Sequence, residues 1–283
     1  MNEAFPWELD SVVWELTLRC CFRCAYCGSR AGEARENELT TAECLEVARQ
    51  LSELGCRRVN LLGGEVFLRP DWREITAALT GKGIPTSVIS ALRADNVPLL
   101  PEFYETLKGY PIFAWQLQAC SPMGNAGAGS LDTRFDPLEV LRFAASEAPK
   151  APFTILVADN IGYFTPEETS IRGGQGLCFG GCSAGLTTLG IDSVGNVRGC
   201  ESLYDERFIE GNLRQRSLRE IWEDENAFRY NREFEPRLLT GKCARCELGE
   251  YCGGGCRSYN YFAGGKLYES PLCPRQPEEG AGL

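Results

Sequence analysis

The chain contains no histidine, and this single absence excludes several kinds of functional site. Zinc sites that mix cysteine with histidine, Rieske centres and the histidine facial triads of non-haem iron all require imidazole ligands. Ser-His-Asp and Cys-His catalysis require an imidazole base. Metal chemistry in this protein must therefore use thiolates and carboxylates.

Long apolar runs and a basic N-terminal segment are missing as well. No run approaches the ~18 apolar residues that span a bilayer, and the acidic residues 1–10 contain no lysine or arginine. We therefore expect no membrane span, no signal peptide and a cytoplasmic location. The formal net charge of -10 disfavours binding to nucleic acids and anionic membranes, because both depend on basic surface.

Cysteine, in contrast, is abundant: the chain has 15. Cytoplasmic thiols stay reduced, so clustered cysteines there usually bind metal instead of forming disulfides. Without histidine, the remaining choices are four-cysteine zinc sites and iron-sulfur clusters.

The first 160 residues alternate between strand and helix patterns. Strands are expected at residues 12–18, 58–62, 85–90, 112–117 and 152–157. Capping signals open the helices between them: Thr40 with Glu43, Asp71 with Glu74, and Asp136 before a proline. Repeated βα units predict a parallel sheet with right-handed crossovers and a site at the carboxyl ends of the strands.

The second half of the chain changes character after Cys182. A hairpin is expected between residues 186–191 and 197–200, followed by a short helix. Residues 240–274 are rich in cysteine and glycine and lack apolar periodicity. Since such a segment cannot bury a core, bound metal is expected to organise it.

Residues 20–27 read CCFRCAYC, directly after the first expected strand. Cys20, Cys24 and Cys27 form C-x3-C-x2-C, whereas Cys21 with the last two would form two C-x2-C steps. Adjacent cysteines point in different directions from an extended chain, so the two neighbours are not expected to bind together. A cubane iron-sulfur cluster needs three or four thiolates, whereas a zinc loop would need a fourth thiolate nearby.

C-x3-C-x2-C with an aromatic residue just before its last cysteine resembles the signature of the radical S-adenosylmethionine (SAM) superfamily. The resemblance implies a [4Fe-4S] cluster on Cys20, Cys24 and Cys27, whose fourth iron chelates the amino and carboxylate groups of SAM. Three protein ligands are then the required number, and Cys21 is a bystander.

Residues 61–66, LLGGEV, end the second expected strand and resemble the family's GGEP motif, with Val66 in place of the usual proline. The resemblance implies that Gly63 and Gly64 let the backbone approach the methionine moiety and that Glu65 accepts from its ammonium group. The alternative for Gly-Gly-Glu alone is a turn. The departure at Val66 concerns only the local loop conformation.

The same resemblance implies three further contacts with SAM. Tyr26 is expected beside the adenine, Ser90 near the methionine carboxylate or the ribose, and Gln118 near the ribose. The alternative for Ser90 and Gln118 is ordinary solvation at a strand end.

The C-terminal half contains Cys182, a G-x4-C that ends at Cys200, C-x2-C-x5-C-x3-C from Cys243, and Cys273. This pattern resembles SPASM, a C-terminal extension of radical SAM enzymes that holds two auxiliary [4Fe-4S] clusters. With Cys178 as an eighth ligand, the resemblance implies two interleaved sets: Cys178, Cys182, Cys200 and Cys256, and Cys243, Cys246, Cys252 and Cys273. Without Cys178, the first auxiliary cluster would have an open iron. A pair of four-cysteine zinc sites is the alternative.

Cys44, Cys56 and Cys120 remain without a cluster role. Cys44 on a helix and Cys56 before a strand are expected to be buried apolar residues. Cys120 follows the fourth strand at the expected catalytic mouth and is a candidate hydrogen-atom donor or substrate ligand, with inert packing as the alternative. Asp159, after the fifth strand, is a candidate proton acceptor, with a turn-forming role as the alternative.

The motifs together predict an α/β fold: a shortened, partial (β/α)6 radical SAM barrel in residues 1–170, followed by a small Cys-rich SPASM domain with a β-hairpin and a helix in residues 171–283. The resemblance implies reductive cleavage of SAM to a 5′-deoxyadenosyl radical. Since similar SPASM enzymes mostly modify peptides, we expect oxidative modification, such as a cross-link, of a ribosomally synthesised peptide. Alternatives are a formylglycine-generating sulfatase maturase, an enzyme that modifies haem or another small cofactor, and a non-catalytic electron-transfer or metal-binding scaffold.

The expected partners are a peptide or protein substrate and a reductant such as flavodoxin or ferredoxin. Many peptide maturases begin with a leader-binding domain, yet this chain enters its first expected strand by residue 12. We therefore expect a separate leader-peptide recognition protein or direct recognition of the substrate core.

Overall fold

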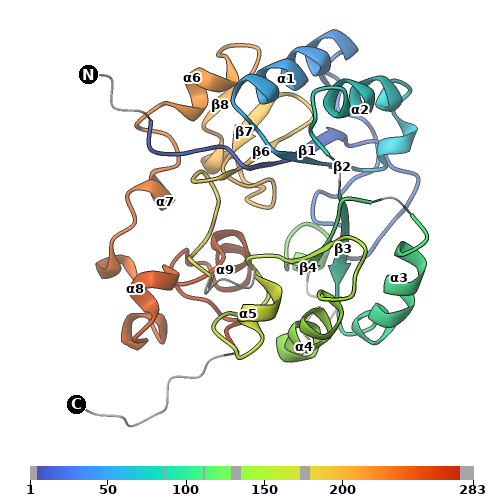
Figure 1. Ribbon diagram of the computed structural model, residues 1–283. Coiled ribbons are helices and arrows are strands. Elements are labelled where there is room, and N and C mark those ends of the chain that lie inside the picture. Colours follow the sequence, from blue (N-terminus) through green and yellow to red (C-terminus); the bar gives the residue numbers. More distant parts are fainter. Residues whose placement is uncertain (1–4, 86, 111, 129–134, 173–178, 275–283) are drawn as a thin grey trace. The chain divides into compact units, whose positions relative to one another are not determined.

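The computed structural model describes residues 5–85, 87–110, 112–128, 135–172 and 179–274. The chain forms two compact units, each built from two stretches of sequence (Figure 1). The first unit contains residues 1–87 and 183–233, and the second contains residues 88–182 and 234–283.

A mixed five-stranded sheet lies at the centre of the first unit, in the order β2-β1-β6-β7-β8. β1 (Ser11–Thr17) is parallel to β2 (Arg58–Gly63) and to β6 (Thr188–Ile191). β7 (Asn196–Arg198) and β8 (Gly211–Asn212) extend the sheet with antiparallel pairing.

Helices α1 (Thr41–Glu53), α2 (Trp72–Thr80), α6 (Leu218–Trp222) and α7 (Arg229–Arg232) belong to the same unit, and α1 lies beside α2 and α6 (Figure 1). The apolar stripe of α1 is buried in one core with Val12, Trp14 and Leu16 of β1. Because side chains alternate along a strand, Glu15 and Thr17 of β1 point to the opposite face. Both are buried there, so this face holds polar groups within the fold.

The second unit contains a parallel sheet in the order β3-β4-β5. Its strands are β3 (Val88–Leu92), β4 (Ala114–Ala119) and β5 (Thr154–Val157). The helices that follow these strands are α3 (Leu100–Leu107), α4 (Pro137–Glu147) and α5 (Glu168–Ile171). Trp115 meets Phe143 and Phe153 edge to face, which joins β4, α4 and the start of β5 in one core.

The Cys-rich end of the second unit contains two short helices, α8 (Gly249–Cys252) and α9 (Arg257–Gly264). Two buried polar side chains hold this segment together: Arg257 and Asn260 both donate to the carbonyl of Leu267, over 3.3 and 3.0 Å. Single turns of 3-10 helix complete the described chain: η1 (Val66–Leu68), η2 (Val97–Leu99), η3 (Ala126–Ala128), η4 (Glu206–Phe208), η5 (Pro236–Leu238) and η6 (Cys243–Arg245).

The predicted α/β fold class is confirmed, and the five expected N-terminal strands and the hairpin appear within three residues of the expected bounds. One detail is wrong: Asp71 precedes α2 but caps nothing, because its carboxylate instead accepts from Arg69 and Thr41. The hairpin of β6 and β7 pairs with β1 in one sheet. The domain boundary near residue 170 stays a prediction.

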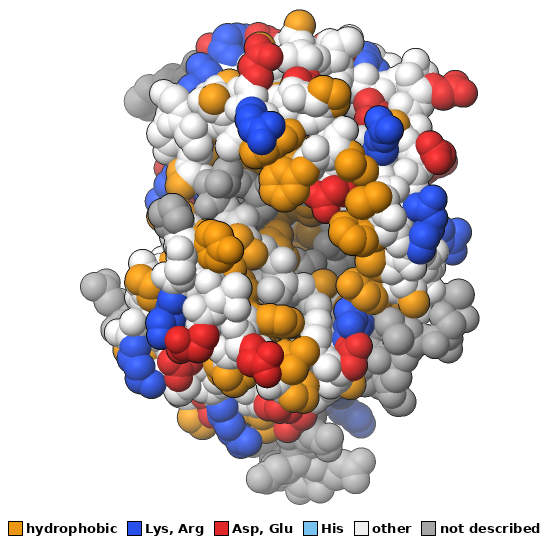
Figure 2. All heavy atoms as spheres, turned by 90° about the vertical axis from the view of Figure 1, so that its right-hand side faces the viewer, with side chains coloured by type: hydrophobic (Ala, Val, Ile, Leu, Met, Phe, Trp, Pro, Cys, Tyr) orange, Lys and Arg blue, Asp and Glu red, His pale blue; other side chains and the backbone are white. Residues whose placement is uncertain are grey.

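Within the described ranges, no helix is long and apolar enough to cross a membrane. On the face drawn in Figure 2, Lys and Arg side chains are interspersed with Asp and Glu.

Candidate functional site

The cysteine loop, residues 18–33, begins where β1 ends and is closed at its base by backbone hydrogen bonds. Cys20 donates to the carbonyl of Gly32 over 2.8 Å, and Gly32 donates to the carbonyl of Leu18 over 3.0 Å. These two bonds bring Gly32, at the end of the loop, back beside Leu18 and Cys20 at its start. The three expected ligands therefore lie on a closed loop at the carboxyl end of β1.

Backbone N–H groups of this loop point at two of its sulfurs. Phe22 donates to the Sγ of Cys20 over 3.4 Å, and Ala31 donates to the Sγ of Cys27 over 3.2 Å. Such bonds stabilise anionic sulfur and tune iron-sulfur clusters. Cys20, Cys24 and Cys27 are half-buried, whereas Cys21 is exposed, as expected for a bystander.

The Gly-Gly-Glu segment at the end of β2 is hydrogen-bonded to the start of this loop. Gly64 donates to the carbonyl of Thr17 and Glu65 to the carbonyl of Arg19, each over 2.7 Å. A Cβ atom on Gly64 would lie 2.2 Å from the carbonyl oxygen of Arg19, so only glycine permits this approach. The two sequence motifs therefore lie next to one another in the first unit.

Glu65 and Tyr26 are both half-buried in the first unit. The Glu65 carboxylate accepts from the backbone N–H of Phe67 over 3.2 Å. This bond fixes the side chain at the start of η1 and leaves its other oxygen as an acceptor for a cationic ligand group.

The two remaining SAM candidates, Ser90 and Gln118, lie in the second unit on opposite faces of the sheet. Ser90 is in the middle of β3, and its hydroxyl accepts from the indole of buried Trp115 over 2.9 Å. Ser90 thus faces the core that packs against the helices. Gln118 accepts from Gln116 on the other face, over 3.2 Å. The predicted contacts of both residues with SAM stay predictions.

Cys120 and Asp159 follow β4 and β5. Cys120 is buried, and Asp159 is half-buried and accepts from Tyr163 through its backbone carbonyl. Asn160, which the sequence did not single out, joins the two strand ends: its side-chain amide donates to the carbonyl of Ala119 over 2.7 Å and accepts from the N–H of Ala119 over 3.0 Å. This two-bond clamp fixes the backbone directly before Cys120.

Cys243, Cys246, Cys252 and Cys273 of the second expected auxiliary set all belong to the second unit. Cys243 and Cys246 bracket η6, and Cys243 accepts from the N–H of Ser270 over 3.4 Å. Burial is the main cause that raises the pKa of the Cys252 thiol to about 12, and the neighbouring Cys273 and Cys243 contribute to this shift. These mutual charge effects indicate thiols that share one environment and need a cation to stabilise their ionised form.

The first expected auxiliary set is described only in part. Cys182 and Cys256 are buried, and Cys200 is half-buried after β7. Cys178 lies outside the described residues. The N–H of Cys256 donates to the hydroxyl of Tyr163 over 3.0 Å, so a buried phenol fixes this ligand's backbone.

A buried ion network between the loop after the cysteines and the β6–β7 hairpin was not found from the sequence. Arg35 forms an ion pair with Glu15 of β1 and also donates to Ser193 and Tyr204. Nearby, burial and then the charge of Glu15 raise the pKa of the Glu201 carboxyl well above its ordinary value. The sequence does not indicate which distant charged residues will form an ion pair, so this network could not be predicted from it.

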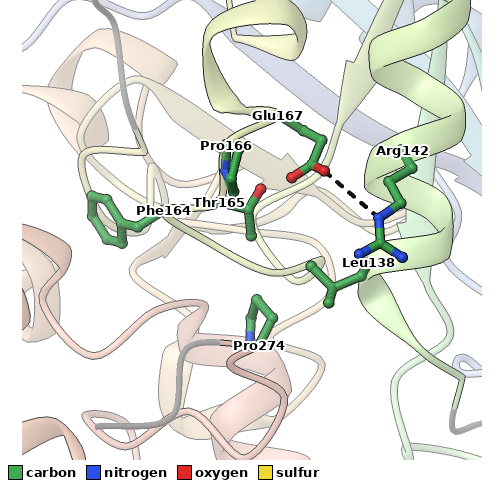
Figure 3. A pocket seen from close by; sticks show the side chains of 7 residues that line it. All are labelled: Leu138, Arg142, Phe164, Thr165, Pro166, Glu167 and Pro274. Atoms are coloured by element: carbon green, nitrogen blue, oxygen red, sulfur yellow. Dashed lines mark ion pairs between the residues drawn. The ribbon is translucent and has the colours of Figure 1, made fainter. Parts of the chain in front are cut away.

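A pocket of about 280 Å³ lies in the second unit (Figure 3). Its lining residues are Leu138, Arg142, Phe164, Thr165, Pro166, Glu167 and Pro274. Figure 3 shows Arg142 and Glu167 facing one another, 3.7 Å apart. Among the residues that the structure describes, none of the expected site residues lines this pocket.

The cysteine loop suits an iron-sulfur cluster, because backbone N–H groups point at two of its sulfurs. Across the described parts of the chain, no three Cys, Asp or Glu side chains are grouped closely enough to hold one ion.

Comparison with protein families identifies the two halves of the site. The model of the radical SAM superfamily matches residues 14–123, and that of the SPASM iron-sulfur cluster-binding domain matches residues 182–247. The chain is a radical SAM enzyme with a SPASM domain. Iron-sulfur clusters and SAM are therefore its cofactors, and the non-catalytic scaffold is not favoured.

Curated relatives of this radical SAM enzyme extend over nearly its whole length. The mycofactocin maturase MftC of Mycobacterium ulcerans is 25% identical, over 93% of this chain and 87% of its own length. The AdoMet-dependent heme synthase of Methanosarcina barkeri is also 25% identical, over 94% of this chain and 96% of its own length. The PqqA peptide cyclase of Rhizobium meliloti is 26% identical, over 93% of this chain and 86% of its own length.

Solved structures share the fold of this radical SAM enzyme. SuiB of Streptococcus suis, in complex with S-adenosylmethionine, superposes with a TM-score of 0.68 and 15% identity, over 95% of this chain and 78% of SuiB. SuiB has also been solved with its precursor peptide SuiA.

Proposed function

We propose that this radical SAM enzyme is a maturase that oxidatively modifies a ribosomally synthesised peptide, for example by a cross-link. The observation that carries the radical SAM chemistry is the pair of 2.7 Å bonds that joins Gly64 and Glu65 to Thr17 and Arg19. They place the Gly-Gly-Glu segment beside the loop of Cys20, Cys24 and Cys27. When bound and reduced, the [4Fe-4S] cluster supplies the electron that cleaves SAM to a 5′-deoxyadenosyl radical.

In this proposal the residues around the cysteine loop orient SAM and exclude water. Cys20, Cys24 and Cys27 hold three irons, which leaves the fourth for SAM. Glu65 accepts from the ammonium group of SAM, and Gly63 and Gly64 allow the methionine part to approach the backbone. Tyr26 lies beside the adenine, with Ser90 and Gln118 as the further candidates.

The eight C-terminal thiols are proposed to hold two auxiliary clusters, which makes three clusters in total. Cys243, Cys246, Cys252 and Cys273 hold one cluster, and Cys178, Cys182, Cys200 and Cys256 hold the other. The influence of Cys273 and Cys243 on the pKa of Cys252 supports a ligand role, because these thiols lie near enough to one another to affect each other's ionisation. We assign these ligands to a SPASM domain in residues 171–283 and the SAM site to residues 1–170.

Cys120 and Asp159 are proposed to act on the substrate as hydrogen donor or ligand and as proton acceptor. Both follow strands of the parallel sheet at their carboxyl ends, the edge at which α/β proteins place their sites. The Asn160 clamp on Ala119 supports this assignment, because it holds the backbone next to Cys120 rigid.

A peptide substrate is supported by the names of two relatives, a mycofactocin maturase and a PqqA peptide cyclase. The heme synthase relative keeps a haem-related substrate as the second candidate. We further propose a cytoplasmic enzyme that receives electrons from flavodoxin or ferredoxin, and that either uses a separate leader-peptide recognition protein or recognises the substrate core directly.

Mass spectrometry of a co-expressed peptide tests the substrate class. Any short peptide that is encoded next to this gene is produced with the enzyme, and with the triple variant of Cys20, Cys24 and Cys27 to alanine as the control. We expect loss of hydrogen mass from the peptide with the native enzyme alone. An unmodified peptide, together with turnover of a haem precursor by the same preparation, would favour the second candidate.

A further inference from the structure

Glu38 lies just outside the cysteine loop, and its carboxylate accepts hydrogen bonds from residues at both ends of that loop. Its Oε1 accepts from the backbone N–H of Leu18 over 2.7 Å and from that of Arg35 over 3.2 Å. Its Oε2 accepts from the hydroxyl of Thr17 over 2.8 Å. One carboxylate therefore ties the last residue of β1, the first residue of the loop and the chain that leaves the loop.

One of the residues that Glu38 holds, Thr17, also binds the Gly-Gly-Glu segment. The carbonyl of Thr17 accepts from Gly64, and the hydroxyl of Thr17 accepts from the N–H of Arg19 over 3.1 Å. The carbonyl of Arg19 in turn accepts from Glu65. Glu38 is thus linked through Thr17 to both carbonyls on which that segment rests.

Helix capping does not account for Glu38. It stands two residues before Thr40, the N-cap of α1, and the reciprocal cap is made by Glu43. Glu43 accepts from Thr40 and forms an ion pair with Arg214, and no bond of its carboxylate reaches the cysteine loop. Arg214 also donates to the backbone carbonyl of Glu38 over 3.3 Å, so the two glutamates share this arginine, but only the Glu38 carboxylate contacts Thr17 and Leu18.

We propose that Glu38 is a positioning residue that sets the distance between the cysteine loop and the Gly-Gly-Glu segment before SAM binds. A carboxylate suits this task because it accepts three hydrogen bonds without donating any, and its charge strengthens each of them. The proposal rests on the SAM site proposed above and adds a residue that touches neither SAM nor a cluster.

The test compares Glu38→Ala, Glu38→Gln and Thr17→Val with Glu43→Ala as the matched control. Reconstituted protein is assayed for iron content, SAM affinity and the change that SAM causes in the electron paramagnetic resonance spectrum of the reduced cluster. Backbone hydrogen exchange at Leu18 and Arg35 is measured on the same samples. Thr17→Val removes the hydroxyl partner of Glu38 with little change of shape and keeps the test informative if Glu38→Ala folds poorly.

We expect Glu38→Ala to keep its iron, to exchange faster at Leu18 and Arg35, and to bind SAM about tenfold more weakly. Glu38→Gln should lie between Glu38→Ala and the native protein, because an amide keeps one acceptor oxygen. The double variant of Glu38→Ala with Thr17→Val should weaken SAM binding by less than the sum of the two single effects, since the two residues share one hydrogen bond. Glu43→Ala should lower thermal stability without changing SAM affinity.

Unchanged SAM affinity in Glu38→Ala, with faster exchange at Leu18, would overturn the positioning role. Unchanged hydrogen exchange at Leu18 and Arg35 in Glu38→Ala would show that the Glu38 carboxylate does not hold these two N–H groups. If the proposed SAM site itself were wrong, the result would be different: SAM would not change the electron paramagnetic resonance spectrum of the native protein.

Discussion

The backbone N–H of Glu65 donates to the carbonyl of Arg19 over 2.7 Å, which joins the end of β2 to the residue directly before Cys20. Arg19 and Glu65 are 46 positions apart in sequence, yet this bond makes the two motifs neighbours. The parallel pairing of β1 with β2 causes it, because carboxyl ends of parallel strands meet at one edge of a sheet.

Gly64→Ala should disrupt this junction. The added Cβ would lie 2.2 Å from the carbonyl oxygen of Arg19, so the segment must move away from the cysteine loop. We expect SAM cleavage to fall by about 100-fold, since displacements near 1 Å have effects of that size. Gly264→Ala is the control, because its Cβ would meet no atom within 4 Å. Equal rates of 5′-deoxyadenosine release in both variants would contradict the account.

Cys20→Ala and Cys21→Ala should differ sharply, although the residues are adjacent. Cys21 is exposed, whereas Cys20 is half-buried and accepts from Phe22. We expect Cys21→Ala to keep the cluster and SAM cleavage, and Cys20→Ala to lose both. Iron content and 5′-deoxyadenosine release measure the difference. If Cys21→Ala lost the cluster and Cys20→Ala kept it, Cys21 would be the ligand and Cys20 the bystander.

Cys44 and Cys56 should resist alkylation at every pH at which the protein is normally handled. Burial raises the pKa of each thiol to about 12, so thiolate forms only as the pH rises toward that value. At pH 8 the thiolate fraction is about 10⁻⁴, and it grows tenfold per pH unit. Peptide mapping after iodoacetamide treatment from pH 7 to 9 should show modification at exposed Cys21 first. Early labelling of Cys44 in folded protein would refute its burial.

Asn160→Asp should destabilise the second unit. A carboxylate cannot donate to the carbonyl of Ala119, and it brings a negative charge to a side chain that is 4% exposed. We expect a loss of about 2 kcal/mol in the free energy of unfolding, measured by urea denaturation. Asn37→Asp, at an exposed position, is the control and should change little.

The sequence predicted the elements and motifs well because these depend on local patterns. Strand composition located β1 and β2, and Thr40 with Glu43 located the start of α1. The residues that were missed act over long distances in sequence. In each case the partner is distant in sequence and is brought close only by folding. The pairs are Glu38 with Thr17, Arg35 with Glu15, and Asn160 with Ala119.

Two details of the expected structure differ because a polar side chain has another partner. Asp71 occupies an N-cap position, but the Arg69 guanidinium and the Thr41 hydroxyl donate to its carboxylate. The expected third strand ends at Ser90, whereas β3 continues to Leu92 and the hydroxyl of Ser90 accepts from Trp115. Thr41 and Trp115 are distant in sequence from the residues that they contact, so no local pattern indicates these bonds.

Anaerobic reconstitution followed by a single assay tests the central claim most directly. Reconstituted protein is mixed with dithionite and SAM, and 5′-deoxyadenosine is quantified by chromatography, with Cys20→Ala as the control. The account predicts 5′-deoxyadenosine from the native enzyme and none from the variant. A native enzyme that carries an intact, reduced cluster on its cysteine loop and releases no 5′-deoxyadenosine would contradict it.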